Sequence, residues 1–296
     1  MTTATSSSSQ SGILAAPLDG GRSLVYRLAL ETDPRAALVR LQGGLDPERT
    51  VVGFGEPLVR ALGHEVPGLR AFPAIAGAAC TVPSTQQALW VMLRGEGPSA
   101  LFDLSTHLAA LVADAFVLDD SVQTFTYAGG RDLTGYLDGT ANPSGDDAVG
   151  YAIVADGPLA GGSFVAVQRW VHDLARFRSH SRAETDAMVG RYKDSNEEIA
   201  DAPATAHVKR TAQEEYSPPA FMVRRSMPWA EGGAEGLEFI AYGRSHDAFE
   251  RQLRRMAGLD DGIVDALFRF SRPVSGGYYF CPPVRDGRID LACLGL

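Results

Sequence analysis

Runs of apolar residues, each about the length of a β-strand, recur along the first half of the chain. Such runs are typical of strands with a buried face when turn residues bound them. The proline- and glycine-rich segment 66–77 predicts a loop. The strands predicted in this half are 24–30, 50–55, 87–94 and 117–127.

Helical periodicity lies between these strands. A helix is predicted at 33–41, where Asp33 suits the N-cap and Pro34 the first turn. A weaker helix is predicted at 56–62. The most regular helix is predicted at 98–116, because leucines recur on one face of it, at Leu101, Leu104, Leu108 and Leu111. The order of elements is therefore close to β-α-β-β-α-β.

The second half repeats this order. A helical region is predicted at 173–192, in which Ser181 and Glu184 have the spacing of a capping box. Further helices are predicted at 248–256 and 263–268 from the spacing of their apolar residues. The strands predicted in this half are 162–172, 221–227, 237–244 and 277–281.

Two copies of β-α-β-β-α-β predict an α+β fold made of two ferredoxin-like units packed together. The first unit is placed at 13–150 and the second at 151–296, because the run 141–162 is rich in glycine, proline and aspartate. Residues 1–12 are almost all small and polar, and we expect them to form a disordered tail.

Composition narrows the class of protein. Of 296 residues, 45% are hydrophobic and 21% are charged, as in a globular protein. The net charge of −9 argues against nucleic-acid binding, and no apolar run is long enough for a membrane helix. The N-terminus lacks the features of a secretory signal, and the three cysteines form no zinc or redox motif. We therefore expect a cytoplasmic protein.

Two stretches carry candidate chemistry. His207 and Arg224 lie 17 residues apart, and an imidazole with a guanidinium suits a metal site that develops negative charge, although a lone histidine is more often structural. In GYLDGTANP, from Gly135 to Pro143, glycines flank Asp138. This run is either an ordinary Asp-Gly turn or a carboxylate positioned over a flat ligand.

Gly135, Asp138 and Gly139 match the GxxDG signature of dye-decolorising peroxidases, and the whole run resembles the form found in the bacterial B-type subfamily. Further segments resemble this family in the same order along nearly the whole chain. These segments are GGSFVAVQRWVHDL (161–174), AHVKRT (206–211), VRRSMP (223–228), EFIAYGRS (238–245) and FSRPVSGGYYF (270–280).

The resemblance implies two ferredoxin-like units with haem b held mainly by the second. It implies that His207 is the proximal iron ligand, Asp138 the distal acid and Arg224 the distal arginine. Ser226 occupies a distal position where many B-type members have asparagine. Arg224 is expected to stabilise developing negative charge and to keep Asp138 ionised.

Other contacts with the cofactor are implied in the same way. The family often places an acid against the proximal imidazole, and Asp265 is the candidate here, although Arg269 lies nearer the matching position. His172 is expected to have a structural or propionate-side role rather than to bind iron. The remaining cofactor-binding candidates are Gly139 and Thr140 in the signature loop, Arg210 against a propionate, and Phe239 and Phe268 along the haem.

The function implied is a haem peroxidase that reduces hydrogen peroxide through a ferryl intermediate and oxidises dyes, phenolics and other one-electron donors. The alternative is a haem carrier or storage protein without peroxidase turnover. The resemblance also implies a homo-oligomer. The short segment after Pro283 is not expected to direct the protein into a protein shell.

Overall fold

The computed structural model describes residues 8–77 and 80–296. Each of the four strands predicted in the first half is present, and they lie in the order β2-β5-β1-β6 with every pair antiparallel. This is the arrangement of a ferredoxin-like unit. Its strands are β1 (Gly20–Leu28), β2 (Thr50–Gly55), β5 (Leu89–Gly95) and β6 (Phe116–Phe125), and its helices are α2 (Arg35–Gly44), α3 (Glu56–Ala61) and α4 (Gly97–Val112).

The second half has the same plan. Strand β10 (Ala234–Gly243) pairs on one side with β7 (Ser163–His172), which also pairs with β12 (Gly277–Cys281). On its other side β10 pairs with two short strands in series, β8 (Val223–Arg224) and β9 (Met227–Glu231). The predicted strand 221–227 is therefore wrong in extent, because regular pairing is interrupted at Arg225 and Ser226, where the N–H of Arg225 donates to the backbone of β10, at the carbonyl oxygen of Ile240, 2.8 Å away.

The remaining elements are shorter. The predicted helix 173–192 is two helices, the second of which begins with the predicted capping box, and the predicted helix 263–268 is a 3₁₀ turn. The elements are α6 (Leu174–Arg178), α7 (Arg182–Val189), α8 (His207–Arg210), η2 (Gln213–Glu215), α9 (Asp247–Met256), η3 (Ala266–Arg269), η4 (Ala292–Leu294), β3 (Ile75–Ala76), β4 (Thr81–Val82), β11 (Ser271–Pro273), β13 (Val284–Arg285) and β14 (Arg288–Ile289).

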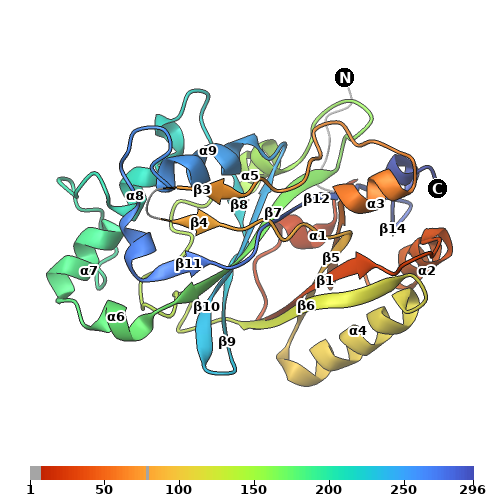
Figure 1. Ribbon diagram of the computed structural model, residues 1–296, viewed down its shortest axis with the longest axis horizontal. Helices are drawn as coiled ribbons and strands as arrows, with labels where there is room; N and C mark the ends of the chain where they lie inside the picture. Colours follow the sequence, from red (N-terminus) through yellow and green to blue (C-terminus); the bar gives the residue numbers. More distant parts are fainter. Residues whose placement is uncertain (1–7, 78–79) are drawn as a thin grey trace.

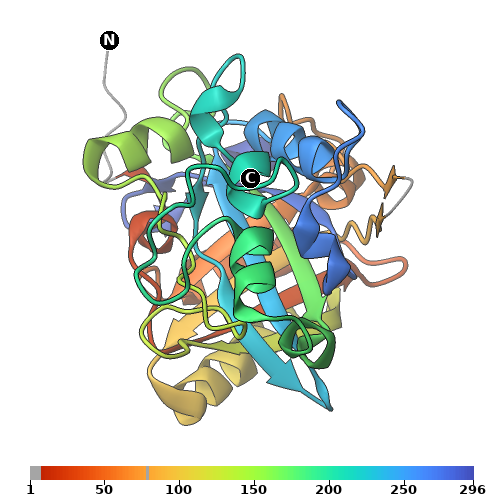
Figure 2. The same cartoon turned by 90° about the vertical axis from the view of Figure 1, so that its left-hand side faces the viewer.

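The two sheets join at both edges and form one barrel. β12 pairs with β2 through Phe280 and Phe54, and β6 meets β9 at Thr124 and Trp229. Eight strands thus follow one another around the ring in the order β7-β12-β2-β5-β1-β6-β9-β10. In Figure 1, α2 and α4 lie at one end of the molecule and α6, α7 and α8 at the other, which faces the viewer in Figure 2. The predicted α+β fold of two packed ferredoxin-like units is confirmed.

Alternate residues of each strand face opposite sides of the barrel wall. On β5, Trp90 and Met92 belong to the core inside the barrel, whereas Val91 and Leu93 belong to the core that includes residues of α2 and α4. On β10, Ile240 faces the interior and Ala241 packs with residues of α9. The barrel wall therefore separates an interior space from the space beneath the helices of the second half.

The N-terminal segment fits against both halves of the chain. Gln10 is buried; its side chain accepts a hydrogen bond from the backbone N–H of Val52 at 2.7 Å and donates to the carbonyl oxygens of Val52 and Pro282. The predicted disordered tail is therefore wrong for residues 8–12, while residues 1–7 lie outside the described residues. Helix α1 (Ser11–Leu14) follows at once.

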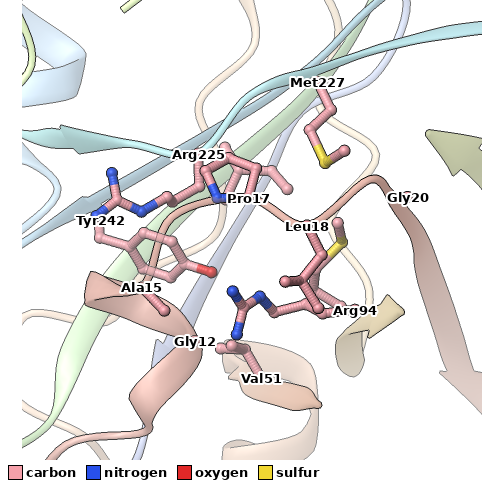
Figure 3. Close-up of a pocket in the computed structure, with 12 residues that line it drawn as sticks. Gly12, Ala15, Pro17, Leu18, Gly20, Val51, Arg94, Arg225, Met227 and Tyr242 are labelled. Atoms are coloured by element: carbon pink, nitrogen blue, oxygen red, sulfur yellow. The ribbon is translucent and has the colours of Figure 1, made fainter. Parts of the chain in front are cut away.

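Two arginines fix this segment from inside the barrel. Arg94 on β5 donates to the carbonyl oxygen of Ala16 at 2.6 Å, and Arg225 donates to that of Leu14. Figure 3 shows both side chains with Tyr242 around a small cavity of about 20 Å³. This end of the barrel is consequently filled.

The segment 126–162 connects the two units and contains a helix that was not predicted, α5 (Gly145–Ala152). Ala148 and Ala152 of this helix pack in the same core as Ile13 and Val223. The boundary predicted near Gly150 stays a prediction. Within the described residues, no helix has both the length and the apolar character needed to cross a membrane.

Candidate active site

His207 is the first residue of α8, and it follows Ala206, which is fully buried. Nδ1 of the imidazole lies 2.8 Å from Oδ2 of Asp265, whose side chain is also fully buried. The other oxygen of Asp265 accepts the backbone N–H of Leu267 at 2.8 Å, so the carboxylate is held in place. The predicted contact between Asp265 and His207 is confirmed. The imidazole remains 33% exposed, which leaves its side away from Asp265 open.

The electrostatics of His207 tie it to the other candidate residues. Burial lowers the pKa of His207, but the Asp265 carboxylate outweighs burial and the net pKa is raised. Arg224 lowers this pKa further and Asp138 raises it. The three side chains therefore act on one another in one site, although they lie in separate segments of the chain.

Asp138 lies in a loop, 129–143, that two glycines shape. Gly135 and Gly139 have φ values of +85° and +70°, which glycine adopts more readily than other residues. The backbone N–H of Asp138 donates to the carbonyl oxygen of Gly130 at 3.1 Å. The run therefore forms a tight Asp-Gly turn, and the position of Asp138 over a flat ligand stays a prediction. Thr140 is exposed, and its hydroxyl oxygen lies 3.2 Å from Nδ2 of Asn196.

Asp138 is open toward the site and closely surrounded by protein elsewhere. This desolvation raises the pKa of its carboxyl, and the charge of Asp132 adds to the effect. The Arg224 guanidinium lowers the pKa, as expected, but it does not overcome burial. Arg224 therefore favours the ionised form of Asp138, as expected, against the effect of burial.

Arg224 is held by two side chains that the sequence did not single out. Asn142 accepts the backbone N–H of Arg224 and donates to its carbonyl oxygen, both at 2.9 Å. The buried side chain of Gln213 accepts from Nη1 of Arg224 at 3.3 Å and donates to the carbonyl oxygen of Ala141 at 2.9 Å. The Asp138 loop and the strand of Arg224 are therefore fixed to each other. Burial lowers the pKa of Arg224, and Asp138 acts against that effect.

A signal for one of these residues was present in the sequence. Asn142 belongs to the GYLDGTANP run, but the argument there rested on the glycines and on Asp138. Gln213 lies in the polar stretch between His207 and Arg224, and nothing in the sequence around it marks a buried amide.

Ser226 lies between β8 and β9, next to Arg225. Its hydroxyl oxygen accepts the backbone N–H of Ile240 at 3.3 Å, so the side chain closes the gap in the strand. Ser226 therefore has a structural contact besides the distal role implied by the resemblance.

Arg210 is held by protein partners. Its guanidinium is buried and makes two hydrogen bonds with the carboxylate of Asp261, at 2.7 and 2.8 Å, and a third with the carbonyl oxygen of Arg255. These partners hold α8 against the end of α9, and the propionate contact of Arg210 stays a prediction.

The two aromatic candidates line the region between the barrel and α9. Phe239 lies 5.9 Å from Phe249 and Phe268 lies 5.4 Å from Trp170, measured between ring centroids. Both are only partly buried, while the rings behind them are buried. They present apolar faces to the side of β10 that is turned away from the barrel interior.

His172 has a partner at each ring nitrogen. Nδ1 lies 2.7 Å from the hydroxyl of Ser271, and Nε2 lies 3.1 Å from Oδ2 of Asp132. These contacts leave no nitrogen for a metal and agree with the structural role expected of this histidine. The Asp132 carboxylate connects His172 with the loop that carries Asp138, through Thr134.

Comparison with known proteins identifies the family. Residues 129–286 match the family model described as Dyp-type peroxidase, C-terminal. The chain is 33% identical over 262 residues to a dye-decolorizing peroxidase of Mycobacterium tuberculosis, an alignment that covers 84% of this chain and 78% of the relative. It is 31% identical to that of Mycolicibacterium paratuberculosis, over 90% and 78% of the two chains.

Solved structures are similar over nearly the whole chain. A dye-decolorizing protein from V. cholerae superimposes with a TM-score of 0.85 at 29% identity, covering 93% of this chain and 97% of that one. A DypB variant from Rhodococcus jostii RHA1, solved in complex with heme, gives a TM-score of 0.84 at 27% identity over 91% and 94% of the two chains. This chain therefore belongs to the dye-decolorizing peroxidase family, and is a haem peroxidase.

Proposed function

We propose that this peroxidase holds haem b through His207, reduces hydrogen peroxide, and oxidises small organic one-electron donors such as dyes and phenolics. The observation that carries the proposal is the pairing of His207 with a buried carboxylate in a site that also contains Asp138 and Arg224. A metal-binding imidazole usually donates its other N–H to a carboxylate, which raises its basicity and fixes the ring.

The donor set fits haem. His207 would hold the iron through the ring nitrogen on its open side, and a single histidine is the proximal ligand in many haem peroxidases. Phe239 and Phe268 offer apolar surface for a flat macrocycle, and the backbone around Gly139 and Thr140 lies beside the carboxyl of Asp138. When bound, haem supplies the redox chemistry, and the protein supplies ligation, orientation and electrostatics.

Asp138 and Arg224 have separate roles in the reaction with hydrogen peroxide. Asp138, with its raised pKa, takes a proton from one oxygen of hydrogen peroxide and returns it to the leaving oxygen. Arg224, fixed by Asn142 and Gln213, places positive charge where negative charge develops as the O–O bond breaks. The hydroxyl of Ser226 supports this pair from the edge of β8.

The location, oligomeric state and partners of the protein are part of the same proposal. We propose that the protein acts in the cytoplasm and as a homo-oligomer, on small donors rather than on nucleic acid, which its net charge of −9 disfavours.

The test is rapid mixing of the haem-loaded protein with one equivalent of hydrogen peroxide, followed by absorption in the Soret region. We expect a prompt spectral change that a phenolic donor reverses. A spectrum that stays unchanged would instead favour a haem carrier. His207→Ala should lose or greatly weaken haem, whereas His172→Ala, which alters a histidine with two protein partners, should retain it. Retention of normal ligation by His207→Ala would assign the ligand role elsewhere.

A further inference from the structure

A second cavity lies inside the barrel, at the end opposite the N-terminal segment. Its volume is about 270 Å³, far more than one ordered water requires. Both halves of the chain line it, through Val25 and Asp120 from the first, and Arg169, Glu238 and Tyr279 from the second. Small eight-stranded barrels have room for one small ligand, and this volume is near the lower end of that of known ligand sites. We call this space the barrel-end cavity.

Glu238 is the most unusual group in the barrel-end cavity. It is only 3% exposed, and burial raises the pKa of its carboxyl to about 7. Ser23 hydrogen-bonds to the carboxylate, and the hydroxyl oxygen of Ser23 in turn accepts from Nε1 of Trp90 at 2.9 Å. The indole N–H thereby directs the hydroxyl hydrogen of Ser23 toward Glu238.

The remaining oxygen of Glu238 is not satisfied by protein. Among the residues that the structure describes, neither Oε2 of Glu238 nor Nε of Arg169 has a hydrogen-bond partner. The two atoms face each other at 3.6 Å, which is too long for a hydrogen bond. A buried carboxylate oxygen without a donor is costly, so a ligand that brings a donor into the cavity gains a strong hydrogen bond.

The charges around the barrel-end cavity select the sign of that ligand. Asp120 neutralises Arg169 through two contacts, at 3.0 and 2.9 Å. Glu238 shares the same arginine, whose Nε lies 3.6 Å from Oε2. The cavity is thus lined by three carboxylates, those of Asp119, Asp120 and Glu238, and by one cation, so it favours a positive ligand and disfavours an anion. Valine side chains and the ring of Tyr279 form the apolar part of the wall and suit a flat apolar body.

We propose that the barrel-end cavity binds a small planar organic cation, whose N–H groups donate to Oε2 of Glu238. Successive residues of a strand face opposite sides of the sheet, so this site lies across β10 from Phe239. It is therefore separate from the site of His207 and Asp138, and its occupation does not depend on peroxidase activity.

Benzamidine is a suitable probe, because it is a redox-inert aromatic cation with two NH2 groups that can donate to a carboxylate. Calorimetric titration of the haem-loaded protein should show saturable binding with one site per chain, with the Soret absorption unchanged. Benzoate, which has the same shape and the opposite charge, should not bind. Glu238→Gln should weaken benzamidine binding by about tenfold or more, since it replaces a charged acceptor with a neutral one.

Two further variants separate the site from general charge effects. Asp119→Asn, which removes an exposed carboxylate at the rim, should change affinity by less than about threefold. Val25→Phe should abolish binding by filling the cavity while every charge stays in place. The proposal is overturned if benzamidine does not bind, if benzoate binds equally well, if the Soret band shifts on binding, or if Glu238→Gln and Val25→Phe both bind like the parent.

Discussion

Replacing Glu238 with glutamine tests whether the buried carboxyl destabilises the folded protein as the pH rises. Burial raises the pKa of Glu238 from 4.5 to about 7. In that window the folded protein holds a proton that the unfolded chain has lost, so the free energy of unfolding falls as the pH rises. The stability that this proton contributes is complete below the unfolded pKa and lost above the folded one. Because the side chain is only 4% exposed, solvent screening is small, and the loss is ~3 kcal/mol.

The assay is urea-induced unfolding of the haem-loaded parent and of Glu238→Gln, at about pH 5 and about pH 8. The free energy of unfolding of the variant relative to the parent should increase by ~2.5 kcal/mol between the two pH values, because only the parent loses the proton. Asp119→Asn deletes a carboxylate on the exposed rim of the barrel-end cavity, which Glu238 also lines, and serves as the control for the loss of one negative charge. A relative stability of Glu238→Gln that does not change with pH would refute the reasoning, since it would mean that the carboxyl titrates alike in both states.

Three further predictions concern the proposed active site. Asp265→Asn should raise the rate of haem transfer to an apo-globin acceptor by about 10–100-fold, because His207 loses its carboxylate partner. Asp261→Asn is the control, since Asp261 pairs with Arg210, which lies on the same helix as His207, and it should not raise this rate. Equal effects of the two variants would contradict a specific role of the contact between Asp265 and His207. Asn142→Ala removes two hydrogen bonds to the backbone of Arg224 and should lower the free energy of unfolding by ~2 kcal/mol, measured by urea; an unchanged midpoint would contradict it. The rate of reaction with peroxide should rise with pH as Asp138 ionises, through a pKa above 3.8, and a profile of Asp138→Asn that matches the parent's would remove the carboxyl from the proton transfer.

Local patterns were sufficient to predict most strands of the barrel, because alternation and apolar runs are properties of the segments themselves. The closure of the ring was not predictable in this way. It depends on pairs such as Phe54 with Phe280 and Thr124 with Trp229, which are remote in sequence and carry no local signal. The prediction of a disordered N-terminal tail was wrong for residues 8–12 for a related reason. A serine-rich composition predicts disorder, whereas one amide, that of Gln10, binds backbone groups of both halves.

The candidate site was found from the sequence where a motif names its residues, and it was incomplete where the chemistry depends on the surroundings. His207, Asp138 and Arg224 stand in segments that resemble a known family, so their roles could be proposed directly. The ion pair between Arg210 and Asp261 could not be predicted, because an aspartate at position 261 is as typical of an exposed surface as of an ion pair. The direction of the pKa shift of Asp138 could not be predicted from Arg224 alone, because desolvation by the surrounding protein raises this pKa more than the guanidinium lowers it.

The positions of Asp138 and Arg224 are set by polar residues outside the motif core rather than by apolar packing around them. Asn142 holds the backbone of Arg224 from the loop that carries Asp138, and Gln213 holds both the guanidinium and that loop. Because each amide bonds to both segments, a shift of the loop necessarily moves the arginine with it. The acid and the cation therefore keep their mutual geometry even if the loop moves relative to His207. His207 is held by Asp265, which belongs to a different segment, after α9. Gln213 lies six residues beyond His207 in the chain, so it also links the segment of His207 with the loop of Asp138. We propose that the flat cofactor lies between His207 and the pair of Asp138 and Arg224.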